Sequence, residues 1–215
     1  MKNVRLFYKK EGLARFVSHL DTMRYMTRLL RRAGLPVWYT EGFNPHLYIT
    51  FAMPLSLGMA SEYEMADIRI EDDEVALDGV CEKLNANCSK GFYFFAATEP
   101  VKKLSELKYA RYRAEFSDVG ALAKRLEEFL SSDEINVEKK TKKGEIKSVN
   151  VAPDIEEFSV EKGDKTSLDI TLPAGNDKTV KPELIINKFL SHNDPECYYK
   201  ITRSMLLDGE KNPLK

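Results

Sequence analysis

The sequence predicts an α+β protein made of two tandem ferredoxin-like (βαββαβ) domains with antiparallel sheets. The order strand, helix, strands, helix, strand occurs in residues 1–103 and again in residues 104–215. This order is typical of a fold in which two helices cover one face of an antiparallel sheet. A polar segment at residues 100–106 has the composition of a linker. We therefore place one domain at 1–103 and the other at 104–215.

In the first domain, the first helix has the clearest signals. Ser18 and Asp21 form a capping box, because each side chain can satisfy an amide of the first turn. Apolar residues then recur at helical spacing up to residue 33, where Gly34 and Pro36 end the pattern. A second helix is expected at 77–88. Strands are expected where apolar and β-branched residues alternate or run between turn residues, at 4–9, 35–40, 46–53, 62–70 and 92–97.

The second domain repeats this order of elements. Helices are expected at 122–130 and from Pro182 to residue 189, because apolar residues share one helical face. Residues 135–140 and 146–151 predict a hairpin around the turn Lys142-Lys143-Gly144. Further strands are expected at 108–116, 155–161, 167–172 and 198–206. The tail at 208–215 is expected to be loose.

Composition limits the class of protein. Hydrophobic residues make up 43% and charged residues 31% of the chain, as in ordinary globular proteins. No apolar run approaches the roughly 20 residues that cross a bilayer, and the N-terminus lacks a secretory apolar segment. Three cysteines without a C-x-x-C pair argue against disulfides and thiolate metal sites. We expect a cytoplasmic protein with no membrane association, no metal and no other cofactor.

Charge is distributed unevenly along the chain. Residues 1–48 carry nine Lys or Arg and three Asp or Glu, within a chain of net charge −1. A basic first quarter suits a phosphate-bearing or otherwise acidic partner. The alternative is that the basic and acidic parts pack together and neutralise one another.

The first helix concentrates arginines on one face. Four of them follow the spacing i, i+4, i+7 and i+8, and arginine can donate two parallel hydrogen bonds to a phosphate. Nearby aromatic side chains could stack on unpaired bases. Alternatively, this is a solvated helix face on which Asp21 pairs with Arg24. In the first interpretation, the residues that bind nucleic acid are Arg15, Arg24, Arg28, Arg31, Arg32, Trp38, Phe43, Asn44, His46 and Tyr48.

Two histidines are candidates for catalysis. His19 falls at the start of the first helix, where the helix dipole favours a neutral base. His46 follows the turn Gly42-Phe43-Asn44-Pro45. Together they could act as general base and general acid on a phosphodiester, or bind a metal with Asp21. The spacing does not force them together, so a capping or core role is the alternative. Phosphate-binding loops and the nucleophile elbow are absent from the sequence.

Part of the chain resembles a bacterial family known as radical-SAM-linked proteins. The matching motifs are Arg15-Phe16, Ser18 to Asp21, Arg24 to Arg32, Ala33 to Pro36, Gly42 to His46 and Pro54 to Gly58. The resemblance implies a domain encoded beside, or fused to, a radical S-adenosylmethionine (SAM) enzyme, with no assigned activity. More distantly, the layout is similar to the CRISPR repeat-RNA endonucleases, although their glycine-rich loop near the C-terminus is absent here.

These observations favour a non-catalytic accessory module that binds RNA, with transfer RNA as one candidate, and works with a radical SAM enzyme. One alternative is a metal-independent RNA-processing enzyme that uses His19 and His46. Another is a protein-interaction adaptor whose loop at 42–59 docks the radical SAM enzyme.

Overall fold

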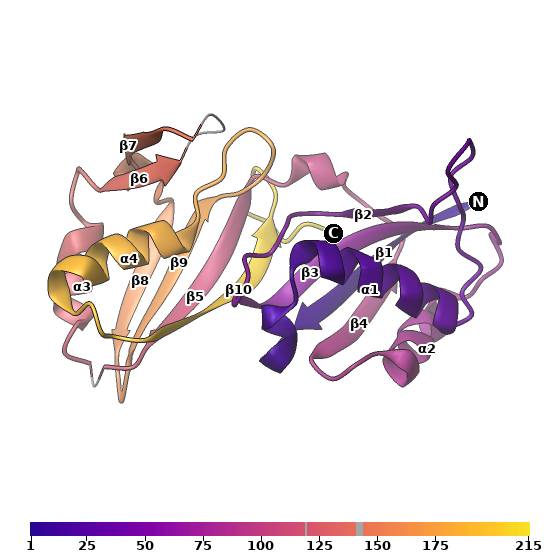
Figure 1. Ribbon diagram of the computed structural model, residues 1–215, viewed down its shortest axis with the longest axis horizontal. Helices are drawn as coiled ribbons and strands as arrows, with labels where there is room; N and C mark the ends of the chain where they lie inside the picture. Colours follow the sequence, from indigo (N-terminus) through magenta and orange to yellow (C-terminus); the bar gives the residue numbers. More distant parts are fainter. Residues whose placement is uncertain (119, 141–143) are drawn as a thin grey trace. The chain divides into compact units, whose positions relative to one another are not determined.

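The computed structural model describes residues 1–118, 120–140 and 144–215. The chain divides into two units, each with its own strands and helices (Figure 1). Unit 1 consists of Met1–Leu107 together with Pro213–Lys215, and unit 2 consists of Lys108–Asn212. The protein is therefore α+β with antiparallel sheets, which confirms the predicted class.

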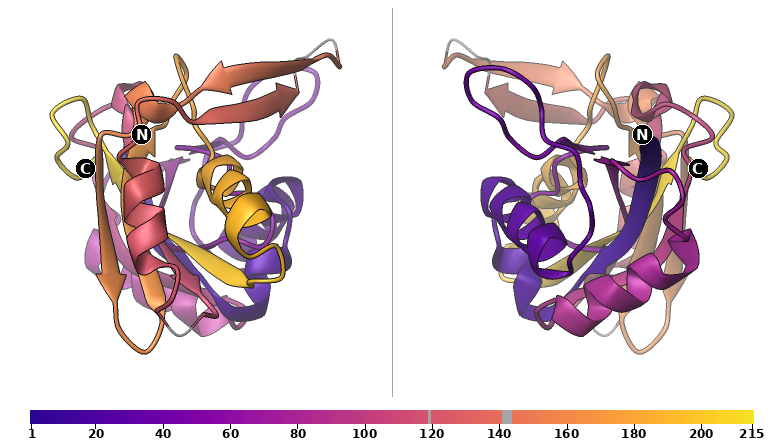
Figure 2. Two further views of the ribbon diagram at one scale, coloured as in Figure 1. Left: turned by 90° about the vertical axis from the view of Figure 1, so that its left-hand side faces the viewer. Right: turned by 90° about the vertical axis from the view of Figure 1, so that its right-hand side faces the viewer.

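In unit 1 the first strand is the centre of the sheet. β1 (Lys2–Lys10) pairs antiparallel with β3 (Ala60–Ile70) on one side and with β4 (Phe92–Thr98) on the other. The short β2 (Ile49–Phe51) pairs with β3, so the strand order is β4-β1-β3-β2. α1 (His19–Arg32) and α2 (Val80–Asn87) are the two α-helices of this unit. The right-hand view of Figure 2 shows them in indigo and magenta.

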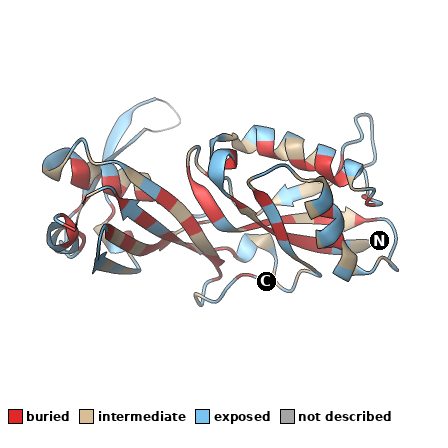
Figure 3. Cartoon of the chain, turned by 90° about the horizontal axis from the view of Figure 1, so that it is seen from below, coloured by how far each residue is buried: buried red, intermediate tan, exposed pale blue. Residues whose placement is uncertain are grey.

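The core of unit 1 explains why these residues form these elements. Side chains alternate across a strand, and Val4, Leu6 and Tyr8 of β1 all lie in one buried cluster with apolar residues of α1 and α2. The helices therefore cover one face of the sheet. The odd-numbered residues of β1 point to the opposite face, which is where the pocket described below is built. Buried residues gather along the strands and on the inner sides of the helices (Figure 3).

Unit 2 has a sheet of the same order. β5 (Tyr109–Phe116) pairs antiparallel with β10 (Tyr199–Leu207) and β9 (Thr166–Pro173), and β8 (Glu157–Lys162) pairs with β9. The order is β10-β5-β9-β8. The helices are α3 (Ala123–Leu130) and α4 (Pro182–Asn193), seen in the left-hand view of Figure 2. β6 (Asn136–Lys140) and β7 (Ile146–Asn150) form the predicted hairpin, but Lys142 and Lys143 at its turn lie outside the described residues.

Short helices of the 3-10 type occur at turns between the main elements. They are η1 (Gly12–Phe16), η2 (Leu77–Gly79), η3 (Leu104–Glu106) and η4 (Ala152–Asp154). The periodicity of the sequence does not predict them, because a single turn has no repeating pattern to detect. Of these, η3 matters for the pocket below, since Leu104 and Ser105 line it.

Two local predictions are wrong. Residues 35–40 do not form a strand: Val37 bridges to Ile70 whereas Tyr39 bridges to Leu47, so no continuous ladder develops. The tail is not loose at its end, because Leu214 is completely buried in unit 1. The Leu214 carbonyl accepts a hydrogen bond from the Tyr63 hydroxyl at 3.1 Å. The Lys215 carbonyl accepts two more, from backbone amides at 101 and 102.

Candidate nucleic-acid interface

The helix α1 begins and ends as its sequence predicts. The Ser18 hydroxyl accepts a hydrogen bond from the Asp21 amide at 3.1 Å and donates to the Asp21 carboxylate at 2.7 Å. Hydrogen bonds from Ser18 and Arg24 lower the pKa of Asp21 below its usual value. At the other end, Gly34 has a φ of +66°, the left-handed conformation that closes a helix.

The four arginines of α1 are all exposed, but they differ in their partners. Arg24 forms an ion pair with Asp21 at 3.2 Å, and Arg32 donates a hydrogen bond to the Asn87 carbonyl. Arg28 and Arg31 make no hydrogen bond or ion pair with any residue that the structure describes. Half of the predicted arginine face is therefore available to a ligand without breaking an existing contact. Arg15, at the end of η1, is half-buried, with its guanidinium 4.6 Å from the Phe16 ring centroid.

The loop at 40–46 presents an aromatic side chain at its tip. Phe43 is fully exposed, and its neighbour Asn44 is exposed as well. The His46 amide donates to the Thr40 hydroxyl at 3.1 Å, and Nδ1 of His46 lies 3.0 Å from the same oxygen. The loop is thus closed across its base by His46 and Thr40, while Phe43 projects from it.

The two candidate catalytic histidines have different neighbours. The His19 ring is half-buried and meets the Phe51 ring edge-on, with centroids 5.5 Å apart. The His46 ring is exposed, and its Nδ1 contacts Thr40 and the Asn44 carbonyl. A shared catalytic site for the two rings stays a prediction. Among the described residues, no group of three or more His, Cys, Asp or Glu side chains is arranged to hold a metal ion.

Trp38 and Tyr48, predicted to stack on bases, instead meet an arginine that sequence reasoning missed. Their ring centroids are 5.8 Å apart. The Cζ atom of Arg69, on β3, lies 4.9 Å from the Trp38 centroid and 4.6 Å from the Tyr48 centroid. Nε of Arg69 donates to the Asn3 side-chain oxygen at 3.2 Å. The arginine is therefore held in one orientation by cation–π contacts and by one hydrogen bond.

Beside this cluster is an open pocket of about 500 Å³, which we call the Arg69 pocket. Arg5 and Asp67 lie within it as direct cross-strand partners on β1 and β3. Nε and Nη2 of Arg5 donate to the two Asp67 oxygens at 2.7 and 2.8 Å, and the Arg5 side chain is completely buried. The lining residues are Asn3, Arg5, Tyr48, Thr50, Asp67, Arg69, Pro100, Val101, Lys102, Lys103, Leu104 and Ser105.

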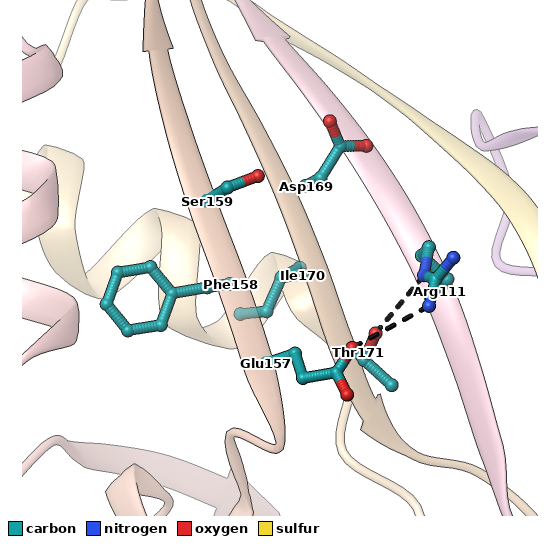
Figure 4. A pocket seen from close by; sticks show the side chains of 7 residues that line it. All are labelled: Arg111, Glu157, Phe158, Ser159, Asp169, Ile170 and Thr171. Atoms are coloured by element: carbon teal, nitrogen blue, oxygen red, sulfur yellow. Dashed lines mark hydrogen bonds and ion pairs between the residues drawn. The ribbon is translucent and has the colours of Figure 1, made fainter. Parts of the chain in front are cut away.

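A hollow of about 430 Å³ on the sheet of unit 2 has a different character (Figure 4). Arg111 lies 3.6 Å from the Glu157 carboxylate and donates to the Thr171 hydroxyl at 3.4 Å. Asp169, which also lines the hollow, pairs with Arg113 at 3.5 Å. Charges here are matched across neighbouring strands, so the hollow is less suited to an anion than the Arg69 pocket.

The residues that the sequence analysis missed share one property. Arg5, Arg69 and Asp67 lie on strands, and their pairing joins positions more than sixty residues apart. Alternation within residues 62–70 does indicate that Asp67 and Arg69 share a face. It does not indicate which strand lies beside them, and this is what creates the pocket.

Comparison with known proteins places the chain in a bacterial group. The family described as "Uncharacterized protein conserved in bacteria (DUF2344)" matches residues 3–182. No curated protein matches the sequence. A chain in the crystal structure of a Cbf5–Nop10–Gar1 complex is similar in fold, with a TM-score of 0.52 and 8% identity. The similarity covers 94% of this chain but only 48% of the chain in that complex. The present chain therefore spans about half the length of the chain that it matches.

The described helices include none that is both long and apolar enough to cross a membrane.

Proposed function

The chain belongs to the DUF2344 family of proteins conserved in bacteria, and we propose its function from its own residues. We infer a non-catalytic, cytoplasmic accessory module that binds RNA, with transfer RNA as one candidate, and acts with a radical SAM enzyme. The single observation that supports RNA binding best is the pair Arg28 and Arg31. Both guanidinium groups are exposed on one helix face and lack partners among the described residues.

The contribution of each predicted contact follows from its surroundings. Arg28 and Arg31 would bind phosphates directly, whereas Arg24 and Arg32 would first have to leave Asp21 and the Asn87 carbonyl. Phe43, which is fully exposed, is the best placed aromatic for stacking on an unpaired base. Trp38 and Tyr48 already contact Arg69, so a base would have to share or displace that cation.

The test is a salt titration of RNA binding to the double variant Arg28→Gln/Arg31→Gln. Each phosphate contact to a single strand contributes about 0.7 to the slope of log K against log salt concentration, so the slope should fall by about 1.4. The matched control is Arg125→Gln, which removes an exposed arginine from α3. We expect this control to leave the slope unchanged. An equal effect of the control and the double variant would refute the assignment.

RNA binding at low salt, together with a co-purification experiment, separates the RNA-binding module from the adaptor alternative. Leu57 is 68% exposed and Phe43 is fully exposed, so the loop at 42–59 carries apolar side chains suited to a protein partner. If RNA does not bind even at low salt, and a neighbour-encoded radical SAM enzyme co-purifies despite nuclease treatment, the adaptor is favoured. RNA cleavage that persists in chelator and is lost in His46→Gln would instead favour the enzyme.

We also propose that each unit is a ferredoxin-like domain; the predicted domains at 1–103 and 104–215 differ from the units in that residues 104–107 and 213–215 belong to unit 1. Support comes from the strand orders β4-β1-β3-β2 and β10-β5-β9-β8. In both units the last strand pairs with the first strand. The hairpin formed by β6 and β7 is an insertion relative to that plan.

A further inference from the structure

We propose that the Arg69 pocket binds a phosphate monoester group. This site is separate from the arginine face of α1 and does not depend on the proposed function. Three neighbouring strands of unit 1 build it: Arg5 and Asp67 are cross-strand partners, and Thr50 is the partner of Asp67 on the other side. Sites built on strands hold their side chains more rigidly than sites built on loops.

The charge of the lining favours an anion. Four cationic side chains line the pocket, against a single carboxylate. That carboxylate, Asp67, already receives two hydrogen bonds from Arg5, which occupy one edge of the Arg5 guanidinium. Arg69 and Lys103, which also line the pocket, therefore give it an excess of positive charge.

Arg5 also has an unused donor. Its Nη1 atom is buried and has no hydrogen-bond partner among the described residues. A buried N–H donor without an acceptor is costly, and a donor on a charged group more so. An anion that enters the pocket and accepts from Nη1 would remove this cost. The buried ion pair with Asp67 would then serve to hold Arg5 in position.

Arg69 is oriented in advance for such a ligand. Nε is engaged by Asn3, and the guanidinium lies against the rings of Trp38 and Tyr48. Its two terminal nitrogens have no hydrogen-bond acceptor among the described residues. Two parallel N–H groups match two oxygens of a phosphate. Because the side chain is already ordered, binding costs less conformational entropy.

The size of the pocket and the other polar groups narrow the ligand class. A volume of about 500 Å³ lies within the range of small-molecule sites, roughly 300–1,000 Å³. A dianionic phosphate monoester suits the excess of cations better than a single carboxylate does. The hydroxyls of Thr50 and Ser105 can hydrogen-bond to its ester or sugar oxygens. Such a group occurs both on free sugar phosphates and nucleotides and at the 5′ end of an RNA strand.

The chain carries its own reporter for this experiment. Trp38 is the only tryptophan, and it contacts Arg69 directly. The full-length protein is titrated with ribose 5-phosphate, which does not absorb in the tryptophan range, while fluorescence is recorded. We expect a saturable change that ribose and chloride at matched ionic strength do not produce. A change that follows ionic strength alone, whichever anion is used, would overturn the proposal.

Variants identify the residues that bind. Arg69→Gln should weaken ribose 5-phosphate binding by about tenfold or more, measured by calorimetry because the substitution also alters the surroundings of Trp38. Lys103→Gln, at an exposed position on the lining, should weaken it by about threefold and serves if Arg69→Gln does not fold. Arg28→Gln is the control and should bind as the unaltered protein does. Unchanged affinity in both pocket variants would overturn the proposal.

A second comparison identifies the source of the phosphate. A short RNA with a 5′-phosphate and the same RNA with a 5′-hydroxyl are compared in the unaltered protein and in Arg69→Gln. An RNA end is the source if the 5′-phosphate strengthens binding and Arg69→Gln abolishes that advantage. A free sugar phosphate is the source if ribose 5-phosphate binds but the RNA advantage is absent. The double variant Arg28→Gln/Arg31→Gln should leave ribose 5-phosphate binding intact, which keeps this proposal separable from RNA binding by α1.

Discussion

Two arginine–aspartate pairs occupy corresponding positions in the two units and differ in their surroundings. Arg5 on β1 is the cross-strand partner of Asp67 on β3, and Arg113 on β5 is the cross-strand partner of Asp169 on β9. The first pair is bidentate, and its arginine is completely buried. The second pair lies at 3.5 Å, with side chains that are 46% and 30% exposed. The same chemistry should therefore contribute very differently to stability.

This contrast gives a prediction for single substitutions. Asp67→Asn leaves the buried Arg5 charge uncompensated, so we expect a loss of about 3–5 kcal/mol in the free energy of unfolding. Asp169→Asn breaks an exposed pair and should cost at most about 1 kcal/mol. Urea denaturation of both variants measures the difference. Equal losses would show that Arg5 gains little from Asp67.

The boundaries of single elements follow from local signals, and α1 is the best example. Ser18 and Asp21 mark the start of α1, and Gly34 marks its end. Because these signals lie within a few residues of the helix ends, the sequence predicts both ends of α1 within about one residue. The segment 35–40 also has a favourable strand composition. Its residues bridge to two different partners, however, and no local pattern can indicate that a ladder is divided in this way.

A carboxylate in the turn before α3 links this turn to the first residue of β9. The Asp118 carboxylate accepts hydrogen bonds from the Leu122 amide at 3.0 Å and from the Thr166 hydroxyl at 2.9 Å. Burial acts to raise the pKa of Asp118, but the hydrogen bonds from Leu122 and Thr166 outweigh it, so the pKa lies below its usual value. The charged form of the Asp118 carboxyl is therefore more stable in the folded protein than in the unfolded chain.

The sign of the resulting pH dependence follows. A lowered pKa contributes stability that is present above the usual aspartate pKa of about 4 and is lost as pH falls through the folded value. Asp118→Ala should cost about 1 kcal/mol or more near neutral pH, because it removes the acceptor of the Leu122 amide and the Thr166 hydroxyl. This difference from the unaltered protein should shrink as the pH falls below about 4. Thermal unfolding of Asp118→Ala and of the unaltered protein across this pH range measures the trend, and a difference that stays constant down to pH 2 would contradict it.

At the scale of the whole molecule, the sequence predicts the α+β class and the succession of elements, because both depend on periodicities within short windows. Two features escape it. The pairing of Arg5 with Asp67 depends on which strands become neighbours. The return of residues 213–215 to unit 1 depends on contacts with residues such as Tyr63, about 150 positions earlier. Long-range contacts of this kind leave no signal in a local pattern.

The buried end of the chain can be tested directly. Leu214→Ala removes a completely buried side chain, so we expect unfolding to be easier by about 2–5 kcal/mol, as for other Leu→Ala substitutions in a core. Leu13 is 85% exposed, and Leu13→Ala should change stability by less than about 0.5 kcal/mol. Chemical denaturation of the two variants makes the comparison. Similar values for both would show that Leu214 contributes nothing to the core of unit 1.

The hydrogen bonds made by Lys215 link this final segment to ligand binding. Its carbonyl holds the amides of Val101 and Lys102 at 3.2 and 2.8 Å, and both of these residues line the Arg69 pocket. A variant that lacks residues 213–215 would therefore lose these hydrogen bonds and loosen one wall of the phosphate site without altering any arginine. This variant should bind ribose 5-phosphate more weakly although its α1 surface is unchanged, so the phosphate site responds to a segment that contributes no cation to it.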